Sequence, residues 1–427
     1  MTCSASSDRK QNIGFVSTRI AGTDGVSLEI AKWADVFEKE GFNCFYFAGR
    51  LEQPPDCSYL AEEAHFKHPD IEYINQNCFG ARTRSRSITK KIHEVCQKIK
   101  DHLYKFIEKF NIELLVPENV LSIPLNIPLG IAITEVISET GIPVIAHHHD
   151  FFWERQNLTT NAVWEYINMA FPPHLPSIWH VVINSSACNQ LSLRTGISAT
   201  VIPNVMDFDN PPAPLDDYAS DVREALGIED DELFILQPTR VVKRKGIEHA
   251  IELVSRLGMK AKLVISHASG DEGYDYEQRV REYSKIMNVN TVFVSDIINE
   301  RRGYTKTGKK IYNLNDIYPQ ADLVTYPSSV EGFGNAFLET IYFRKPIVVN
   351  TYAIYTMDIK PKGFSTIEIN GYVTEKVIHE TKKVLTDPEY RNKMVASNYE
   401  IAKHYYSYSV LHQKLKNLIL DYTTYKR

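Results

Sequence analysis

The sequence lacks the features that mark disulfide-rich, zinc-binding and membrane proteins. Its six cysteines are scattered over the first 188 residues without a Cys-x-x-Cys pair, which favours a reduced chain over a disulfide framework or a zinc site. No stretch approaches the roughly 20 apolar residues that span a bilayer, and Met1–Gln11 is polar, unlike the core of a secretory signal. A formal net charge of −5 argues against nucleic acid as the main partner. The composition is that of an ordinary soluble, cytoplasmic enzyme.

Strand-like and helix-like segments alternate along both halves of the chain. Its 427 residues, 43% of them hydrophobic, suffice for two or three domains with large cores. Strand, crossover helix, strand is the pattern of a parallel doubly wound sheet. In the first half the predicted helices are Val26–Glu40, Ile88–Phe110, Leu129–Thr140 and Ser185–Thr195. The predicted strands are Ile13–Ser17, Asn43–Phe47, Glu113–Pro117, Pro143–His147, Trp179–Asn184, Thr200–Pro203, Leu233–Pro238, Lys262–Ser266, Thr291–Ser295, Leu323–Pro327 and Pro346–Asn350.

Two such sheets are expected, one in each half. The segment Pro203–Asp217 between them is rich in proline, asparagine and aspartate, which is typical of a linker. Ligands of open parallel sheets bind at the carboxyl ends of the strands. Two facing sheets would therefore place their ligands around one cleft.

Two glutamates bracket a glycine-rich loop in the second half. Glu331 follows the predicted strand Leu323–Pro327, and Glu339 lies about one turn into the next helix. Gly332 and Gly334 permit close backbone approach to a ligand, and the N–H groups at the helix start attract anions. A carboxylate has two acceptor oxygens, so Glu339 can hold two vicinal hydroxyls of a ribose while Glu331 holds a second polyol. The alternative is a pair of solvent-facing glutamates around a helix cap.

The stretch from Ala321 to Pro346 resembles the signature of family 4 glycosyltransferases. It combines an aspartate that opens the strand, a Pro-Ser turn, the Glu-Gly-Phe-Gly loop, the second glutamate and a Lys-Pro pair before another apolar strand. The resemblance implies a retaining, nucleotide-sugar-dependent enzyme of the α/β GT-B fold, with two Rossmann-like domains. Its domains would be 1–205 on the acceptor side, 206–400 for the donor, and a helix at 401–427 that packs back on the first. The donor-binding loop would include Gly332, Phe333, Gly334, Asn335 and Glu339.

A basic turn supports a diphosphate ligand. Arg240 and Lys245 lie between the strand Leu233–Pro238 and the next helix, so both can reach one anion. The family resemblance assigns them to the donor diphosphate, which they would stabilise as it leaves. A solvated basic turn is the alternative, and Lys243 and Arg244 are expected to be its exposed members.

The first half has a matching loop, Thr18–Ser27, after its first strand. Gly22 and Gly25 permit positive φ, and the helix start supplies donors. With Asp24 they resemble the family loop that closes over the diphosphate. A helix cap is the alternative, because the loop is not a Gly-x-Gly-x-x-Gly motif.

Three histidines and an aspartate, His147 to Asp150, end another strand. Strand neighbours point to opposite faces, so we expect that they do not converge on one ion without a sharp bend. We predict no metal and no cofactor. The resemblance implies that one histidine contacts the donor sugar, His149 or, failing that, His148. A structural histidine remains the alternative for at least one of the three.

Two basic segments are left over. Residues 297–310 are longer and more basic than the family pattern, and are interpreted as a solvated hairpin or as a cover for the cleft. Ala81–Phe110 has apolar residues at helical spacing and a basic outer face. We interpret it as a helix packed on the sheet, with contact to an anionic lipid or phosphorylated acceptor as the less favoured alternative.

The predicted activity is transfer of a hexose from a UDP- or GDP-linked sugar to a hydroxyl acceptor, with retention of the α configuration and without a metal. Arg240, Lys245 and the helix start at Asn335 would stabilise the leaving diphosphate, and Glu331 and His149 would act at the sugar. A GT-B-like epimerase or phosphorylase, or a non-catalytic sugar-binding protein, are the alternatives. The donor base and sugar, the acceptor (small molecule, glycan or lipid-linked sugar) and the oligomeric state stay open.

Overall fold

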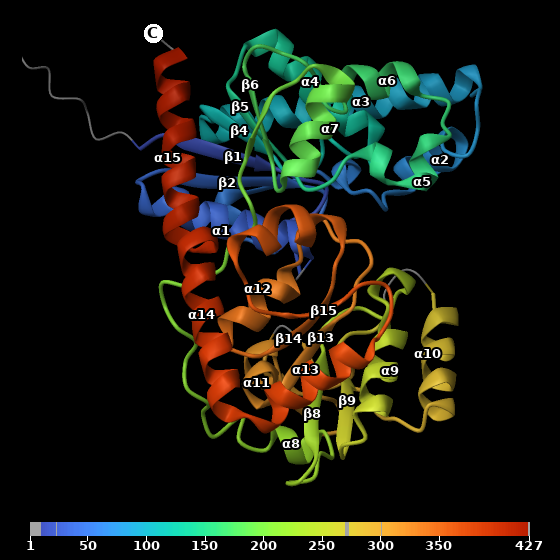
Figure 1. Cartoon of the computed structure of the whole chain (residues 1–427). Helices are drawn as coiled ribbons and strands as arrows, with labels where there is room; N and C mark the ends of the chain where they lie inside the picture. Colours follow the sequence, from blue (N-terminus) through green and yellow to red (C-terminus); the bar gives the residue numbers. More distant parts are fainter. Residues whose placement is uncertain (1–9, 23, 270–272, 300, 426–427) are drawn as a thin grey trace, which may run out of the picture. The chain divides into compact units, whose positions relative to one another are not determined.

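The structure, a computed structural model, describes residues 10–22, 24–269, 273–299 and 301–425. It divides into two compact units (Figure 1). The first contains the residues up to Pro203 together with those from Leu411 onward, and the second runs from Asn204 to Val410. The chain thus leaves the first unit once and returns to it with its last helix.

The first unit is built on a seven-stranded sheet with the order β3-β2-β1-β4-β5-β6-β7. Every neighbouring pair is parallel, as the alternation of strands and helices predicts. Its strands are β1 (Asn12–Val16), β2 (Asn43–Ala48), β3 (Ser58–Leu60), β4 (Leu114–Pro117), β5 (Val144–His148), β6 (Ile178–Val182) and β7 (Ala199–Val201). Its helices are α1 (Gly25–Lys39), α2 (Pro69–Cys78), α3 (Arg86–Phe110), α4 (Ile127–Thr140), α5 (Gln156–Thr159), α6 (Trp164–Ala170) and α7 (Ser185–Thr195), with most of α15 (Tyr408–Tyr425).

Helix α3 forms where its apolar spacing predicts it. The Ser85 hydroxyl caps its start by accepting the Ile88 N–H, and Asn111 ends it in the left-handed conformation with φ 54°, an arrangement that asparagine tolerates. The apolar stripe is buried in the core of the unit, while the basic residues line the other face. The interpretation as a packed helix with a charged outer face is confirmed. The buried members of the stripe are Ile88, Ile92, Val95, Ile99, Leu103 and Phe106.

The second unit is built on a six-stranded parallel sheet with the order β10-β9-β8-β13-β14-β15. Strands β8 and β13 are neighbours although the 85 residues from 238 to 322 separate them in the chain. Their carboxyl ends therefore meet at one edge of the sheet. The strands are β8 (Leu233–Gln237), β9 (Ala261–Ile265), β10 (Asn290–Phe293), β13 (Leu323–Tyr326), β14 (Ile347–Asn350) and β15 (Ile367–Ile369). The helices are α8 (Val222–Ala225), α9 (Ile247–Leu257), α10 (Asp275–Ile286), α11 (Leu314–Ile317), α12 (Asn335–Tyr342), α13 (Glu375–Thr386) and α14 (Pro388–Tyr406).

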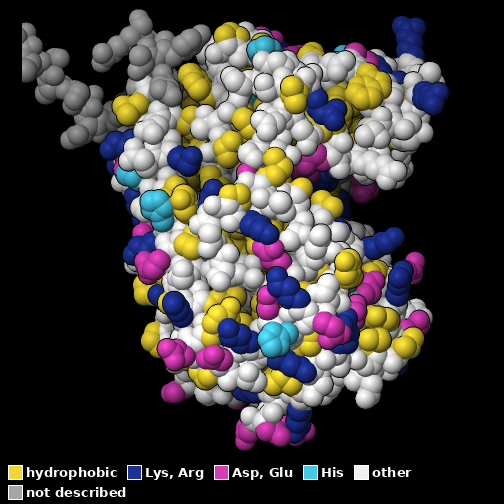
Figure 2. Space-filling model, in the orientation of Figure 1, with side chains coloured by type: hydrophobic (Ala, Val, Ile, Leu, Met, Phe, Trp, Pro, Cys, Tyr) yellow, Lys and Arg dark blue, Asp and Glu magenta, His cyan; other side chains and the backbone are white. Residues whose placement is uncertain are grey.

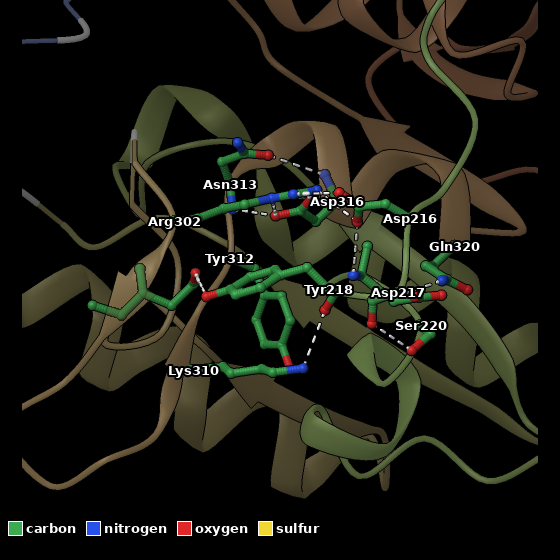
Figure 3. A network of polar contacts seen from close by, with 12 residues as sticks. Asp216, Asp217, Tyr218, Ser220, Arg302, Lys310, Tyr312, Asn313, Asp316 and Gln320 are labelled. Atoms are coloured by element: carbon green, nitrogen blue, oxygen red, sulfur yellow. Dashed lines mark hydrogen bonds and ion pairs between the residues drawn. The ribbon is translucent and has the colours of Figure 1, made fainter.

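The basic segment 297–310 contains a short antiparallel hairpin, β11 (Gly303–Tyr304) with β12 (Lys310–Ile311). Figure 3 shows the polar network at its base. The Tyr218 hydroxyl donates toward carbonyl oxygens of both strands, at 2.8 and 2.9 Å. The Arg302 guanidinium binds Asp316 and Asp216. The hairpin is anchored at its base while its turn is exposed; Glu300 lies outside the described residues.

Two surface properties bear on partners. Among the described residues, no helix combines the length and apolar content needed to cross a membrane. On the face drawn in Figure 2, basic and acidic side chains are interspersed, without a large area of one sign. This distribution agrees with the small net charge.

Candidate active site

Two loops of the second unit meet at the carboxyl edge of its sheet. One follows β8 and contains Arg240 to Gly246, and the other follows β13. The Ser329 N–H donates to the Arg244 carbonyl at 2.8 Å. A Cβ on Gly246, which has φ 58°, would lie 2.6 Å from the Pro327 carbonyl oxygen. Only glycine allows this approach, so the two loops pack directly against each other.

A buried ion pair links these loops. Lys245 Nζ contacts Glu331 Oε1, and Arg244 Nη1 lies 3.3 Å from Glu331 Oε2. Lys245 is 8% exposed. Burial lowers the pKa of the Lys245 ammonium, and Glu331 opposes that effect. Burial alone would raise the pKa of the Glu331 carboxyl, but Lys245 and Arg244 outweigh it and hold the pKa below its usual value. The Glu331 carboxylate is therefore charged at neutral pH.

The other basic residues of the turn differ in their surroundings. Arg240 and Lys243 are exposed. Arg244 was expected to be exposed like Lys243, yet it is half-buried because Glu331 binds it. Sequence reasoning also missed His267, just after β9. Burial, together with the nearby positive charges of Lys245 and Arg240, lowers the pKa of His267 to about 4. This edge of the sheet is therefore cationic and suits a bound anion.

The glycine loop leads directly into α12. Gly334 is the N-cap residue with φ 117°, and a Cβ there would lie 2.6 Å from the Tyr352 hydroxyl. That hydroxyl donates to the Phe333 carbonyl at 2.8 Å, which fixes the loop from beneath. Asn335 Oδ1 accepts from Asn204 Nδ2 at 2.7 Å. The start of α12 is thus held rigidly beside the cationic edge, with Gly332 between Glu331 and the buried Phe333.

Glu339 lies one turn into α12, as predicted. The Tyr318 hydroxyl donates to Glu339 Oε2 at 2.7 Å. Tyr318 is fully buried and stacks on Phe343 with ring centroids 5.1 Å apart. Burial raises the pKa of Tyr318 well above its usual value, so the phenol stays a donor. No local pattern identifies Tyr318, because its contact with Glu339 spans 21 residues.

The loop after β1 is organised around a helix cap. The Asp24 carboxylate accepts from the Ser27 N–H at 3.3 Å and from the Ser27 hydroxyl at 2.7 Å. Gly22 has φ 72°, and its N–H donates to Glu52 at 3.1 Å. Gly25 was expected to permit positive φ, but it is the first residue of α1 because Asp24 caps the helix there. Thr23 lies outside the described residues.

A second polar cluster lies at the ends of β4 and β5. Glu118 Oε2 is 2.9 Å from His147 Nδ1 and 3.2 Å from His149 Nε2. His148 points to the opposite face, where its Nε2 lies 2.9 Å from His180 Nδ1. We expected the three histidines not to converge, but His147 and His149 do, because residues two apart on a strand share a face.

This cluster has a donor set that could hold a metal ion. One ligand atom each from Glu118, His147 and His149 lies within 4.8 Å of the other two, and two imidazoles with one carboxylate suit several transition metals. Two N–H donors that share one carboxylate oxygen also account for the convergence. Burial would lower the pKa of His149, but Glu118 outweighs burial and raises it.

The fold and the charged edge together agree with the glycosyltransferase that the sequence predicts. Residues 219–401, which include Arg240, Lys245, Glu331 and Glu339, match the family described as Glycosyl transferases group 1. The chain is 32% identical over 441 residues to mannosylglucosylglycerate synthase from Thermotoga maritima, covering 96% of this chain and 99% of the relative. It is 31% identical over 389 residues to the Petrotoga mobilis protein of the same name, covering 84% and 86%. The chain therefore belongs to the group 1 glycosyltransferases.

Solved structures agree on the fold. Sucrose-phosphate synthase from Thermosynechococcus elongatus has a TM-score of 0.68 at 14% identity, with 97% of this chain and 100% of that chain covered. Anabaena HepE in complex with UDP and glucose has a TM-score of 0.63 at 13% identity, with 96% and 100% covered. The predicted family and GT-B fold are confirmed. The protein is an enzyme, a glycosyltransferase, that moves a sugar from a donor to an acceptor.

Proposed function

We propose that the protein is a retaining hexosyltransferase that forms an α-glycosidic bond without a metal ion. The observation that carries this proposal is the buried Lys245–Glu331 pair beside Arg240, at the junction of two adjacent strand ends. A diphosphate bound there would draw Lys245 away from Glu331. The freed carboxylate would then accept hydroxyl groups of the hexose.

The reaction assigns a role to each group. The bond between the anomeric carbon and the diphosphate breaks, and its electron pair leaves with the diphosphate. Arg240, Lys245 and the first N–H groups of α12 stabilise that charge, and this stabilisation is expected to lower the activation barrier more than any other effect. The acceptor oxygen bonds to the same face of the anomeric carbon, and its proton passes to the leaving phosphate. Glu331 then positions the hexose, Glu339 holds the ribose, and His149 contacts the transferred sugar.

The remaining donor-site residues act through the backbone. Gly332, Phe333 and Gly334 would present the loop to the donor, and Asn335 begins the helix beneath it. For Gly22, Asp24 and Gly25, in the first unit, the family resemblance alone predicts a role in donor binding. Asp24 already caps α1, so we assign it to holding that loop rather than to direct contact.

We further propose a mannosyl donor and glucosylglycerate as the acceptor. The support is the identity of 32% with a relative named mannosylglucosylglycerate synthase, over nearly the whole of both chains. The product in that name contains a mannosyl, a glucosyl and a glycerate group. A transferase would complete it by adding the mannosyl group to a glucosylglycerate hydroxyl, which makes a small anionic acceptor preferable to a lipid-linked one.

One assay tests the whole proposal. The protein is incubated with UDP- and GDP-linked hexoses, with and without glucosylglycerate, and nucleoside diphosphate release is measured while the anomeric configuration of the product is read by NMR. We expect acceptor-dependent release and an α-linked product. A β-linked product would exclude retention. Interconverted nucleotide sugars would indicate an epimerase, and binding without turnover a sugar-binding protein.

Metal independence is tested in the same assay. Side-chain cations and helix N–H groups take the place of a divalent ion at the diphosphate, so activity is expected to survive EDTA. Loss of activity in EDTA that Mn²⁺ or Mg²⁺ restores would contradict a metal-free reaction.

A further inference from the structure

Glu118 is a fully buried carboxylate whose partners are unusual. Its exposure is 0%, and among the described residues no lysine or arginine lies within ion-pair distance of it. One oxygen, Oε2, faces both His147 Nδ1 and His149 Nε2, while Oε1 is buried and has no hydrogen-bond partner in the described part of the chain. A buried carboxylate is costly unless its partners satisfy it, so these two imidazole N–H groups are what hold it in place.

The same strand end also fixes the backbone of His149. Asn119, next to Glu118, has φ 61°, and its Oδ1 accepts the His149 N–H at 3.0 Å. The Ser122 hydroxyl donates to that Oδ1 at 2.8 Å, and the Asn119 N–H donates to the His147 carbonyl at 2.8 Å. The end of β4 therefore controls both the main chain and the ring of His149.

The two histidines on Glu118 are not equivalent. The His147 side chain is 1% exposed, and its ring stacks on Trp33 with centroids 4.2 Å apart. Its Nε2 is buried and has no hydrogen-bond partner among the residues that the structure describes. The His149 side chain is 11% exposed. Because Nε2 of His149 faces Glu118, Nδ1 is the nitrogen that remains to meet a ligand.

We propose that Glu118 is a positioning residue for sugar transfer: it holds His149 with Nε2–H toward the carboxylate, so that Nδ1 is presented to the transferred hexose. His147 supplies a second N–H donor to the same carboxylate oxygen and so helps to fix the orientation of the Glu118 side chain. The inference rests on the proposed function, in which His149 contacts the transferred sugar. Glu118 itself does not touch the substrate.

Kinetics test the positioning role. Glu118→Gln keeps a carbonyl oxygen that can accept both N–H groups, so kcat is expected to stay within about fivefold of the wild type. Glu118→Ala removes the acceptor, and kcat is expected to fall roughly 10- to 100-fold with little change in the donor KM. In a His149→Gln background the same Ala substitution is expected to cost no more than about threefold, since the two residues act as one unit. Equal losses in both backgrounds would overturn the proposal.

A matched control is available on the other face of β5. His180→Ala removes the partner that lies 2.9 Å from His148 and disturbs a pair of comparable burial without touching Glu118. It is expected to lower thermal stability while kcat stays within about threefold. A loss of kcat as large as that of Glu118→Ala would mean that any damage to this strand impairs the enzyme, and would overturn the assignment.

A spectroscopic test does not depend on activity or on the folding of the Ala variant. In the histidine-selective ¹⁵N–¹H spectrum of the full chain, the His149 signals are identified by their loss in His149→Gln. They are expected to show a proton on Nε2 in the wild type and in Glu118→Gln. A proton on Nδ1 alone would overturn the proposal. So would one equivalent of zinc or manganese retained after dialysis and lost in His149→Gln, because the cluster would then be a metal site. Absence of transferase activity with every donor would instead refute the proposed function, and the spectrum would still test the geometry.

Discussion

Lys245 and Glu331 bind each other in the structure. Because of this pairing, mutations in the basic turn are expected to differ in how they affect catalysis and how they affect stability. Lys245 is buried, so removing it leaves the buried Glu331 carboxylate with the half-buried Arg244 as its remaining cation, which is expected to cost up to about 3–5 kcal/mol of stability. Arg240 is exposed, so its removal does not carry that cost. The two cations therefore affect catalysis alike but stability differently.

From this difference we predict distinct signatures for two variants. Arg240→Ala is expected to lower kcat about a hundredfold, since charge on the leaving group goes unbalanced, with an unchanged melting temperature. Lys245→Ala is expected to lower both kcat and the melting temperature. The double variant should lose less kcat than the product of the single losses, because both residues act on one diphosphate. Steady-state kinetics and thermal unfolding measure this, and near-wild-type turnover by Lys245→Ala would refute its assignment.

A second prediction for single residues concerns Glu339 and its partner Tyr318, and the affinity for the nucleoside diphosphate. Glu339→Ala is expected to weaken binding of the nucleoside diphosphate by roughly 1.5–3 kcal/mol, the worth of a charged hydrogen bond. Tyr318→Phe keeps the stack on Phe343 and removes only the hydroxyl that orients Glu339. Its Kd is expected to rise roughly fivefold, since such a bond is worth about 1 kcal/mol net.

Calorimetric titration with nucleoside diphosphate measures both variants. The matched control is Tyr355→Phe, because the Tyr355 hydroxyl donates to Glu368 at 2.8 Å at a different strand of the same sheet. It is expected to leave the Kd unchanged. Unaltered affinity in Glu339→Ala would contradict the ribose assignment.

Part of this site could be predicted from sequence because its signals are local. Arg240, Lys245 and Glu331 are recognisable from a strand end, a glycine and a helix start that lie within a few residues of each other. The pairing of Arg244 with Glu331 and the contact of Tyr318 with Glu339 join residues 87 and 21 positions apart. The first contact exists only after β8 and β13 have become neighbours, and the second only after α12 has packed beside the segment that precedes β13, so no local pattern encodes either.

At the scale of elements, Gly334, the N-cap of α12, is a position that the fold restricts to glycine. Gly334→Ala is expected to destabilise the second unit, because the residue has positive φ and the new Cβ meets the Tyr352 hydroxyl at 2.6 Å. Left-handed strain alone costs about 1–2 kcal/mol, and the clash adds to it. Nucleotide affinity should fall as well, since the start of the helix shifts.

Gly363→Ala is the matched control for this prediction. Gly363 also has positive φ, at 92°, but a Cβ there meets nothing within 4 Å. It should show the strain without the clash and retain nucleotide affinity. Thermal unfolding and titration measure both variants. If their melting temperatures and nucleotide affinities are equal, the close contact between residue 334 and the Tyr352 hydroxyl does not affect stability or binding.

Elements differ in how well their sequence predicts them. Helix α3 has an amphipathic stripe along 25 residues, and the prediction differs from the structure by two residues at its start. Strands β3 and β15, three residues each, were not predicted because so few residues carry little periodicity, although β7, an edge strand of the same length, was predicted as Thr200–Pro203. The hairpin β11–β12 depends on Tyr218 and Arg302, whose partners lie far away in sequence.

At the scale of the whole molecule, the chain returns to its first unit with α15. Three leucines of this helix, Leu411, Leu415 and Leu418, are buried at 0%, 1% and 4% exposure. Lys414 Nζ donates to the Val201 carbonyl at 2.9 Å, and His412 contacts Glu40. The last helix is therefore part of the core of the first unit.

Truncation before Leu411 is accordingly expected to destabilise the first unit. Burial of one leucine side chain contributes about 1.5–3 kcal/mol, so the loss of three approaches the 5–15 kcal/mol that stabilises a typical domain. Leu415→Ala is a milder test, expected to cost about 2–5 kcal/mol, and Leu193→Ala on α7, 87% exposed, should change stability by less than about 0.5 kcal/mol. Denaturant unfolding followed by the fluorescence of tryptophans such as Trp33 in the first unit measures each effect. A truncated chain that unfolds at the wild-type midpoint would show that the first unit is stable without its last helix.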